Sequence, residues 1–545
     1  VSGLFEKATE TKNNPTIFIG EDHLGDIWFV DKQKGVSRYD CKKKSVSHYF
    51  TLDEYLPETE QTGGYFFHED KDRNIIVWPK YGVLGYYDSA TDRLVPVMTN
   101  GSYIDMKTFF FDRQGNLWHS DQHNLGKLSV FNRHFQLENN ASEVRSLFVD
   151  RQKRIWIASK DGCIKIEDAN RVLVGYLNTQ GRITRERVIF GGNVYGMMQE
   201  TDGTLWLGMR NSGLVILKPM SPKEDSYKVI TYKNDKNNPY SLSDNSIFSI
   251  LKDSRGHIWI GTYGGGLNLV QNAGDLTHLG FINKNNQMMT YPKNFYSKVR
   301  YLYEDHNAVF VCTTDGLLTF SVQNNNPGNI KFYINERSPY RTDGLSNNNV
   351  MYMFKDSRGH LYAVEYGGGF SRLLSTNYLT NHLVFKSYSE KEGLLSDLAL
   401  SMVEDSQGFL WIFMERGISR FNPEKETFTN FKNDFFMGEF SISECLPVID
   451  GRHDICVGTD AGVLCFSSTR LKKRNFIPHI VFTEVKSQNK LFKSSRYDYN
   501  TLEIEPDERS FSIRFAALDY ASSDEINYAY RLKGGENEWH YTGTS

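Results

Sequence analysis

One short pattern recurs along the chain, and this repeat constrains the fold more than any other feature. Its clearest copy is KDSRGHIWIGTYGGGLNLV, at residues 252–270. When the copies are aligned on the tryptophan, consecutive anchor positions lie 38 to 53 residues apart. Seven of the eight tryptophans take this position, so the pattern is a structural period. The ten anchors are Trp28, Trp78, Trp118, Trp156, Trp206, Trp259, Phe310, Tyr362, Trp411 and Cys456.

Each copy carries a turn signal before its anchor. An aspartate usually stands six residues before the anchor and a glycine three residues before it, as at Asp253 and Gly256. Aspartate at the first position of a type I turn bonds its own backbone, and glycine supplies the left-handed residue that follows. Alternating apolar residues at 246–251 and 258–262 therefore predict two strands joined by a hairpin.

The three glycines at 264–266 raise the alternative of a phosphate-binding loop. Such a loop needs a helix N-terminus behind it. Residues 267–270 read Leu-Asn-Leu-Val, which is typical of a strand, and no helical period follows. We interpret the glycines as a second hairpin turn that leads into a third strand. A weaker fourth strand follows in several units, for example at 427–431.

Four short strands per unit, with a periodic aromatic residue, predict an all-β chain of β-propeller blades in which each anchor packs between neighbouring blades. Ten units exceed the roughly four to eight blades of one ring. We therefore divide the chain into the last three or so blades of an N-terminal propeller at 1–137 and a complete seven-bladed propeller at 138–472. Alternating segments at 480–485, 501–505, 511–515 and 528–532 lack the repeat, and they predict the start of an Ig-like β-sandwich at 473–545.

Composition excludes several classes of function. The net charge is −3 and the charges are mixed, so no basic stripe indicates nucleic-acid binding. No apolar run is long enough to cross a bilayer, so membrane attachment would need a segment absent from this chain. The six cysteines form no metal-binding spacing, and we expect neither a metal nor a cofactor. We expect buried free thiols, with a disulfide among Cys445, Cys456 and Cys465 as the alternative.

Two sets of motifs resemble a known family. DSRGHIWIGTYGGGLNLV (253–270), DSRGHLYAVEYGGGFSRLL (356–374) and DSQGFLWIFMERGISRFNP (405–423) are similar to the regulator-propeller repeat. The segment FSIRFAALDYASSDEINYAYRLKGGENEWHYTG (511–543) resembles the opening of the triple-tyrosine domain. In this order the motifs resemble the periplasmic sensor region of bacterial hybrid two-component systems, whose histidine kinase and membrane helix lie outside this chain.

The resemblance implies a function. Such a region would bind an oligosaccharide released by glycan breakdown, and it would signal by a conformational or dimer change. The expected partners are that oligosaccharide and, in the full-length receptor, a second copy of the chain. The chain itself is expected to have no enzymatic activity and to lie in the periplasm.

A ligand is expected at the ends of the strands opposite to the Asp-x-x-Gly turns. That face would carry the residues after each anchor strand and the residues that lead into each innermost strand. Sugars offer apolar faces and a rim of hydroxyl groups, so aromatic platforms beside amide and charged side chains suit them. The predicted contacts are Arg145, Lys160, Arg210, Asn211, Asn245, Tyr263, Arg300, Asn349, Glu365, Tyr366, Glu415 and Arg416.

Two other functions fit the same pattern. A propeller scaffold for protein–protein interaction would use a broad surface on the same face. A propeller glycosidase or lyase would need paired carboxylates, for which Glu365 and Glu415 are the candidates. We interpret His257, His306, His360 and His453, on the turn side, as surface residues. No nucleophile elbow occurs in the sequence, which disfavours the enzyme reading.

Overall fold

A computed structural model of the chain describes residues 142–469 apart from 293, 325 and 433–439. It also describes 16–31, 35–49, 65–69, 73, 75–79, 85–88, 92–96, 98–99, 102–103, 108–112, 117–120, 125–128 and 135–139. At the C-terminal end it describes 479–487, 490–492, 510–517, 526, 528–531 and 539–543. The chain divides into two units: residues 133–472 form one, and residues 1–132 with 473–545 form the other.

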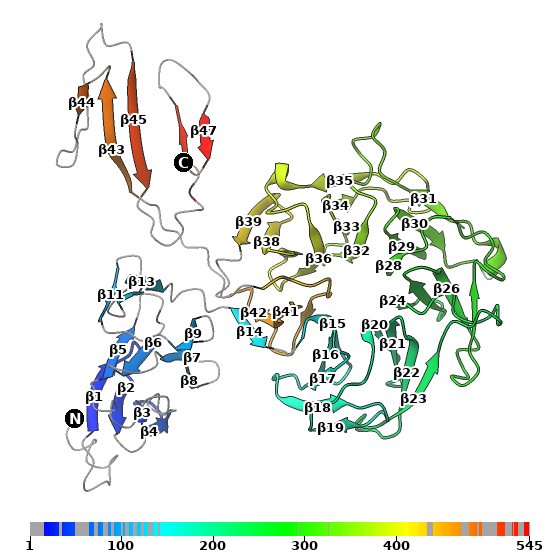
Figure 1. The fold of residues 1–545 in the computed structure, drawn as a ribbon, viewed down its shortest axis with the longest axis horizontal. Helices are drawn as coiled ribbons and strands as arrows, with labels where there is room; N and C mark the ends of the chain where they lie inside the picture. The colour runs from blue at the N-terminus through cyan, green and yellow to red at the C-terminus, as the bar shows by residue number, and fades with distance from the viewer. Residues whose placement is uncertain are drawn as a thin grey trace. The chain divides into compact units, whose positions relative to one another are not determined.

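The unit at 133–472 is a ring of seven antiparallel sheets (Figure 1). The first two sheets are β15 (Val144–Val149), β16 (Ile155–Ser159), β17 (Ile164–Glu167), β18 (Leu173–Leu177) and β19 (Ile183–Thr184), then β20 (Asn193–Gln199), β21 (Leu205–Arg210), β22 (Gly213–Pro219) and β23 (Tyr227–Tyr232). The third and fourth are β24 (Ile247–Lys252), β25 (Ile258–Thr262), β26 (Gly266–Gln271) and β27 (Gly280–Asn283), then β28 (Val299–Asp305), β29 (Ala308–Thr313), β30 (Leu317–Ser321) and β31 (Tyr333–Asn335).

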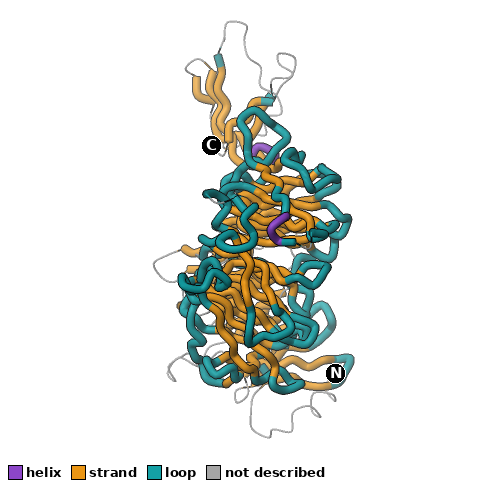
Figure 2. The backbone as a smooth tube through the Cα atoms, turned by 90° about the vertical axis from the view of Figure 1, so that its right-hand side faces the viewer, coloured by secondary structure: helices purple, strands orange, loops and turns teal. Residues whose placement is uncertain are grey.

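The fifth and sixth sheets are β32 (Val350–Lys355), β33 (Leu361–Glu365), β34 (Gly369–Leu373) and β35 (Phe385–Tyr388), then β36 (Ala399–Glu404), β37 (Leu410–Met414), β38 (Gly417–Asn422) and β39 (Thr427–Lys432). The seventh comprises β40 (Val448–Ile449), β41 (Ile455–Gly458), β42 (Gly462–Phe466) and β14 (Phe135–Asn139). This order confirms the predicted seven-bladed propeller. Figure 2 shows that strands and loops make up nearly all of the described chain, with short turns of helix at η4 (Pro327–Asn329) and η5 (Glu390–Glu392).

The ring is closed by its first strand. β14 precedes the first sheet in sequence, but it pairs antiparallel with β42 and completes the seventh sheet. The unit therefore begins near residue 133, a few residues before the predicted boundary at 138. In the β17–β18 turn, Arg171 donates to Asp450 Oδ2 at 2.7 Å and to Asp454 Oδ2 at 2.6 Å. These ion pairs join the first sheet to the seventh.

The repeated aspartate has a second role that the turn pattern alone does not reveal. In the third sheet Gly256 N–H donates to Asp253 O at 2.9 Å, and the glycine has a φ of +87°, as the turn prediction requires. Asp253 Oδ1 accepts the N–H groups of Arg255 and His257, while its Oδ2 accepts the Trp259 indole N–H at 2.8 Å. The same indole bond recurs at Trp28, Trp118, Trp156, Trp206 and Trp411, with Glu200 as the acceptor for Trp206.

The hydrophobic core lies between neighbouring sheets. Trp259 of the third sheet packs with Val299, Leu302 and Phe320 of the fourth, and its ring centroid lies 4.8 Å from that of Phe320. In the same way, the ring centroid of Trp411 in the sixth sheet lies 5.0 Å from that of Phe466 in the seventh. The prediction that the anchors pack between blades is confirmed for these units.

The cysteines follow both predicted alternatives. Cys163, Cys312 and Cys445 are buried free thiols, and Cys41 is an exposed one. Cys456 and Cys465 face each other on β41 and β42 and form a disulfide, so the free-thiol prediction is wrong for this pair. The reason is that Cys456 occupies an anchor position, where the strand pairing brings it directly opposite Cys465.

The other unit also contains four-stranded sheets. One is β1 (Thr16–Glu21), β2 (Ile27–Asp31), β3 (Gly35–Asp40) and β4 (Ser45–His48), and another is β5 (Tyr65–Glu69), β6 (Ile75–Pro79), β7 (Gly85–Asp88) and β8 (Arg93–Pro96). β9 (Met98–Thr99) pairs with β10 (Ser102–Tyr103) in a two-stranded sheet. β11 (Thr108–Phe111), β12 (Leu117–Ser120) and β13 (Leu125–Leu128) form a three-stranded sheet. The anchors Trp28, Trp78 and Trp118 lie on β2, β6 and β12, as expected for three blades.

The C-terminal segment contains β43 (Ile480–Ser487), β44 (Lys490–Phe492) and β45 (Phe511–Ala517) in one sheet, and β46 (Tyr528–Tyr530) with β47 (His540–Gly543) in another. Three of the four predicted strands are present, and the fourth, at 501–505, lies outside the described residues. Membership of an Ig-like sandwich stays a prediction. Among the described residues there is no helix with the length and hydropathy that a membrane crossing requires.

Candidate functional site

The two sets of predicted ligand contacts lie on one face of the ring. Because the strands are antiparallel, the end of the second strand in each sheet lies beside the start of the innermost one. Tyr263 N–H donates to Ser246 O at 2.7 Å, Lys160 N–H to Glu143 O at 2.8 Å, and Tyr366 N–H to Asn349 O at 2.9 Å. We call the residues at these strand starts, around the centre of the ring, the mouth.

A bulge repeats at the mouth in six of the seven sheets. Each innermost strand skips one residue in its pairing with the second strand, between Val144 and Ser146 in the first sheet and at the matching place in the others. A bulge leaves the skipped residue outside the ladder and redirects its side chain. The skipped residues are Arg145, Tyr195, Phe248, Arg300, Met351 and Leu400.

Three aromatic rings form a continuous stack along one side of the mouth. The Tyr195 and Phe248 centroids are 4.2 Å apart, and Phe248 stacks on Tyr263 at 4.6 Å with an angle of 17° between the ring planes. Cations flank both ends. The Arg145 and Arg210 guanidinium carbons lie 5.8 and 6.0 Å from the Tyr195 centroid.

At the other end of the stack, Lys298 Nζ lies 5.6 Å from the Tyr263 centroid and the Arg300 guanidinium carbon lies 5.5 Å from it. Such distances are within the range of cation–π attraction. An aromatic–cationic strip therefore runs from the first sheet to the fourth.

Arg300 also makes a contact across the mouth. Its Nε donates to Asn349 Oδ1 at 3.0 Å in the fifth sheet, and its Nη1 lies 3.5 Å from Glu444 Oε2. Glu444 stands in the loop before β40, in the seventh sheet. The fourth and seventh sheets are not neighbours in the ring (Figure 1), so this ion pair joins sheets that do not pack against each other.

The fifth and sixth sheets give the mouth a different character. Tyr366 O–H donates to Glu415 Oε1 at 2.8 Å, and this hydrogen bond to a carboxylate raises the pKa of the Tyr366 phenol. At the bulge positions of these two sheets, Met351 and Leu400 are buried. This side of the mouth is acidic and apolar, whereas the opposite side is aromatic and cationic.

Glu365 is the predicted contact that does not face the mouth. It is fully buried, and its Oε2 accepts the Ser346 hydroxyl and the Asn347 N–H, the latter at 2.8 Å. Burial raises the pKa of this carboxyl to about 7. The side chain anchors the loop before β32, so we leave it out of the proposed site; one member of the predicted carboxylate pair, Glu365 with Glu415, is thus buried.

The remaining predicted contacts lie at the rim. Lys160 is exposed and lies 3.3 Å from Glu143 Oε2, which also accepts Arg145 Nη2 at 3.0 Å. Asn211 is exposed and accepts the Ser246 hydroxyl, whereas the Asn245 side chain accepts the Asn234 N–H and so holds its own loop. Arg416 is exposed.

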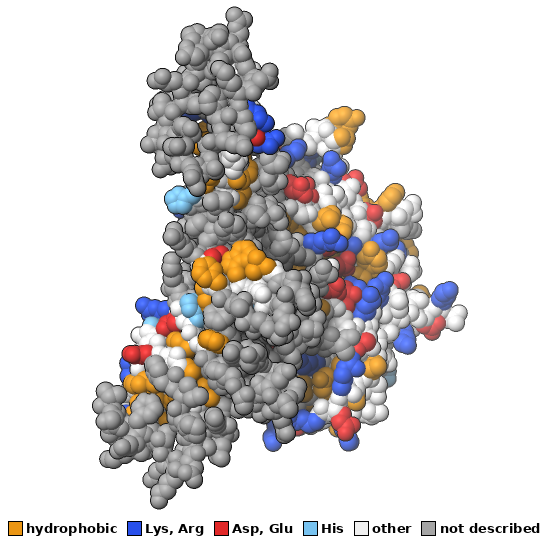
Figure 3. All heavy atoms as spheres, turned by 60° about the vertical axis from the view of Figure 1, so that its left-hand side comes forward, with side chains coloured by type: hydrophobic (Ala, Val, Ile, Leu, Met, Phe, Trp, Pro, Cys, Tyr) orange, Lys and Arg blue, Asp and Glu red, His pale blue; other side chains and the backbone are white. Residues whose placement is uncertain are grey.

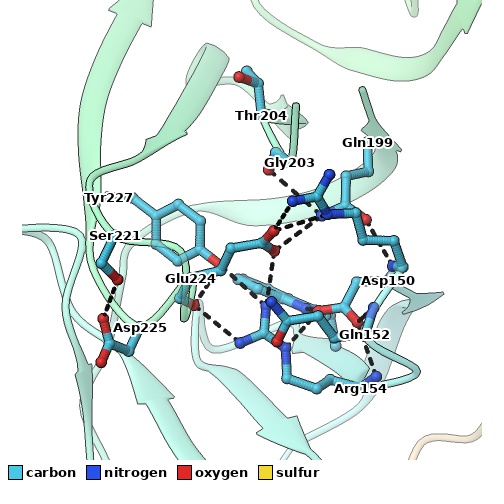
Figure 4. A network of polar contacts seen from close by, with 12 residues as sticks. Asp150, Gln152, Arg154, Gln199, Gly203, Thr204, Ser221, Glu224, Asp225 and Tyr227 are labelled. Carbon is cyan, nitrogen blue, oxygen red and sulfur yellow. Dashed lines mark hydrogen bonds and ion pairs between the residues drawn. The ribbon is translucent and has the colours of Figure 1, made fainter. Parts of the chain in front are cut away.

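The opposite face is occupied by the turns and by saturated polar networks. Glu224 accepts Arg151 Nε at 2.8 Å. In Figure 4 Glu224 also accepts Arg154 Nη2 at 3.4 Å, and Arg154 Nε donates to Asp150 Oδ2 at 2.6 Å. Glu224 and Arg154 are buried, and Tyr227 O–H donates to the Glu224 carbonyl at 2.8 Å. These groups already satisfy one another, so we assign this cluster to holding the first two sheets together.

The histidines of the turns also have local partners. His257 Nδ1 and Asp253 Oδ2 are 3.0 Å apart, and His360 Nδ1 and Asp356 Oδ2 are also 3.0 Å apart. His306 side chain is 72% exposed beside Asp305. Among the described residues, no group of three His, Cys, Asp or Glu side chains is placed to hold a metal ion. Over the face shown in Figure 3, acidic and basic side chains of the described residues are interspersed, in keeping with the mixed charge of the sequence.

Sequence reasoning missed four residues of the mouth. Tyr195 and Phe248 are not among the predicted contacts, although they hold the same repeat position as Arg145 and Arg300. An alignment of the innermost strands would have found them. Lys298 stands directly before β28 as Asn349 stands before β32, so the same alignment would have found it, whereas Glu444 lies in the loop before β40.

Comparison with known proteins identifies the repeat. Residues 241–264, which lead into and include the first two strands of the third sheet, match the family described as two component regulator propeller. The chain is 20% identical over 451 residues to "Histidine kinase P4" of Formosa agariphila, a match that covers 79% of this chain and 30% of that protein. The chain thus spans less than a third of the length of this curated relative.

Two solved structures are similar to the chain over nearly its whole length. One is the extracellular domain of BT3049 of B. thetaiotaomicron, a protein assigned to the hybrid two component systems, with 18% identity, 98% of this chain and 80% of that chain covered, and a TM-score of 0.34. The other is the extracellular domain of BT4673, assigned likewise, with 17% identity, coverage of 99% and 77%, and a TM-score of 0.37. The fold described above rests on the sheets themselves and not on these superpositions.

Proposed function

We propose that this chain is the ligand-sensing region of a bacterial hybrid two-component sensor, exposed to the periplasm, and that it binds an oligosaccharide at the mouth of the seven-sheet ring. The regulator-propeller repeat and the histidine kinase relative support the sensor assignment. A sensor of this kind would signal through a change of conformation or of dimer geometry in the full-length receptor, because a ligand can shift only an equilibrium between states that it binds differently.

The observation that carries the ligand class is the aromatic–cationic strip. Tyr263 is partly exposed at the end of the Tyr195–Phe248–Tyr263 stack, so it offers a flat apolar surface to a sugar ring. Arg210 lies against Tyr195 at the other end of the stack, and Asn211 accepts the Ser246 hydroxyl; both are exposed and can bond to hydroxyl groups. Aromatic platforms beside such donors and acceptors are what a carbohydrate site requires.

The test is isothermal titration calorimetry of the chain against a panel of neutral and acidic oligosaccharides, with the mixtures analysed for cleavage. We expect saturable binding without cleavage. Tyr263→Ala should weaken the binding at least tenfold, which is about 1.4 kcal/mol. Arg255→Ala is the matched control, because Arg255 is an exposed arginine of the same sheet on the turn face.

Other outcomes of the titration would contradict the proposal. Breakdown of a panel member would move the chain to the propeller glycosidases and lyases. Binding that Tyr263→Ala and Arg255→Ala leave equally strong would place the site away from the mouth. No binding to any panel member would favour the protein-interaction scaffold.

A further inference from the structure

The cations at the mouth are poorly neutralised. Arg210 donates only to the Tyr195 hydroxyl, at 3.2 Å, and neither Arg210 nor Lys298 forms an ion pair within the described part of the chain. Arg154 and Arg171, elsewhere in the ring, are by contrast paired with carboxylates. A surface that keeps unpaired positive charge beside an aromatic stack attracts an anion.

The two arginines at the bulges have donors to spare. The Arg145 and Arg300 side chains are each 13% exposed. Arg145 Nη2 donates to Glu143 Oε2, which also accepts a hydrogen bond from Lys160 Nζ. The Arg145 Nε is buried and has no acceptor. Arg300 uses its Nε for Asn349, and its contact with Glu444 is long, at 3.5 Å. A guanidinium has five N–H donors in a fork that fits carboxylate and sulfate oxygens.

Glu444 is the internal anion of this site. It reaches Arg300 across the mouth from the seventh sheet, and its side chain is 39% exposed, so the pair is open to solvent at one end. A partly exposed ion pair of this length contributes little to stability. A ligand anion that approaches along the Tyr263 ring can therefore replace Glu444 at low cost.

We infer that the mouth recognises an acidic glycan. The anionic group of the glycan replaces Glu444 as the ion-pair partner of Arg300, while its sugar ring lies against Tyr263. This inference rests on the proposed function and narrows it to one ligand class. The anionic group is a carboxylate or a sulfate ester, two sources of the same charge and similar oxygen geometry. Arg145, Arg210 and Lys298 supply the surrounding positive field.

The experiment uses pairs of probes that differ only in charge. Oligogalacturonides and their carboxyl-reduced counterparts test the carboxylate, and sulfated carrageenan oligosaccharides and their desulfated counterparts test the sulfate ester. We expect one charged member to bind at least about tenfold more tightly than its neutral counterpart. Added NaCl should weaken the charged member and leave the neutral member unchanged, because salt screens the charges.

Two variants separate the roles of the ion pair. Arg300→Gln should reduce the affinity for the charged probe at least about tenfold and remove its preference over the neutral one. Glu444→Gln removes the internal competitor, so the charged probe should bind several-fold more tightly. Glu424→Gln is the control, because Glu424 is an exposed ion-paired glutamate at the turn face. Circular dichroism of each variant checks that the fold is kept.

The outcomes distinguish this inference from the proposed function. Equal binding of charged and neutral members overturns the acidic-ligand inference and leaves the oligosaccharide sensor in place. An unchanged affinity of Glu444→Gln for the charged probe overturns the displacement of Glu444. Failure of every probe in both arms to bind overturns the proposed function and the inference together.

Discussion

At the residue scale, the repeated aspartate joins two tasks that keep a blade in shape. In the units of Trp28, Trp156, Trp259 and Trp411, one carboxylate oxygen of the aspartate holds the turn and the other accepts the anchor indole N–H. The carboxylate is nearly fully buried, so both bonds are made away from water. The anchor position therefore favours a side chain that is large and also carries an N–H donor. This explains why seven of the eight tryptophans occupy it.

We predict that Trp259→Phe destabilises the ring by about 1.5–3 kcal/mol, because it removes a hydrogen bond to a buried charged group. Urea denaturation followed by circular dichroism measures this loss. Trp539→Phe is the matched control, since Trp539 is 54% exposed and stands outside the repeat. Equal stability of the two variants would show that the Trp259–Asp253 bond contributes nothing beyond ring packing.

A second residue-scale prediction concerns pH. Burial raises the pKa of Glu365 from 4.5 to about 7, so the native carboxyl keeps its proton where the unfolded chain has lost it. The native state then binds more protons between these values, and its stability falls as the pH rises through this window and levels off above it. Each pKa unit corresponds to about 1.4 kcal/mol, which puts the total on the order of 3 kcal/mol.

Glu365→Gln should lack this slope, because glutamine does not titrate and keeps an oxygen for Ser346 and Asn347. Denaturation at a series of pH values between about 4.5 and 7 measures the difference between the two chains. Glu424→Gln, at an exposed site, should keep the slope of the original chain. Parallel curves for the original chain and Glu365→Gln would contradict the raised pKa.

At the scale of elements, the ring depends on a junction between its first and last sheets. Arg171 belongs to the β17–β18 turn, yet its partners Asp450 and Asp454 precede β41. The Arg171 side chain is 4% exposed and that of Asp450 is fully buried. Such a pair stabilises mainly because either partner alone would be a buried uncompensated charge.

We predict that Arg171→Ala lowers the free energy of unfolding by roughly 3–5 kcal/mol, since it leaves the Asp450 carboxylate buried without its cation. The free energy of unfolding of Arg171→Lys should lie between those of the original chain and Arg171→Ala. Lysine keeps the positive charge but lacks the guanidinium fork that reaches both aspartates. Urea denaturation gives both values, with exposed Arg255→Ala as the reference. A loss no larger than that of Arg255→Ala would mean that the strand pairing alone closes the ring.

At the scale of the whole molecule, the ring is one unit because its first strand finishes its last sheet. β14 pairs with β42 through five residue pairs, so a chain that lacks it would expose the edge of β42. The disulfide between Cys456 and Cys465 ties β41 to β42 but does not cover that edge. The closure thus depends on residues that lie more than 300 positions apart in sequence, roughly the whole length of the unit.

We predict that residues 133–472 fold alone and melt in one transition, and that residues 141–472 melt at least roughly 5 °C lower and aggregate more readily. Differential scanning calorimetry and light scattering make the comparison. A chain of residues 128–472 serves as the control for the added length and should match 133–472. Equal melting temperatures of the chains 133–472 and 141–472 would show that β14 does not contribute to the stability of the ring.

The sequence alone determined the repeat, the turn chemistry and the number of sheets in the ring. These follow from local signals: an Asp-x-x-Gly turn, alternating apolar residues and an anchor every few dozen positions. It also predicted which face carries the mouth, because antiparallel order fixes which strand ends lie together. Tyr263 and Arg300 were predicted as ligand contacts for that reason.

Only the tertiary structure decided which of these residues meet. Glu365 obeys the same sequence pattern as Tyr263, yet it is fully buried, because the loop before β32 folds over it. Tyr195 and Phe248 look like core residues until the bulge redirects them, and Arg300 meets Glu444 across the centre of the ring from 144 positions away in sequence. A repeat encodes contacts within a blade and between neighbours, whereas contacts across the opening arise only when all seven sheets have closed.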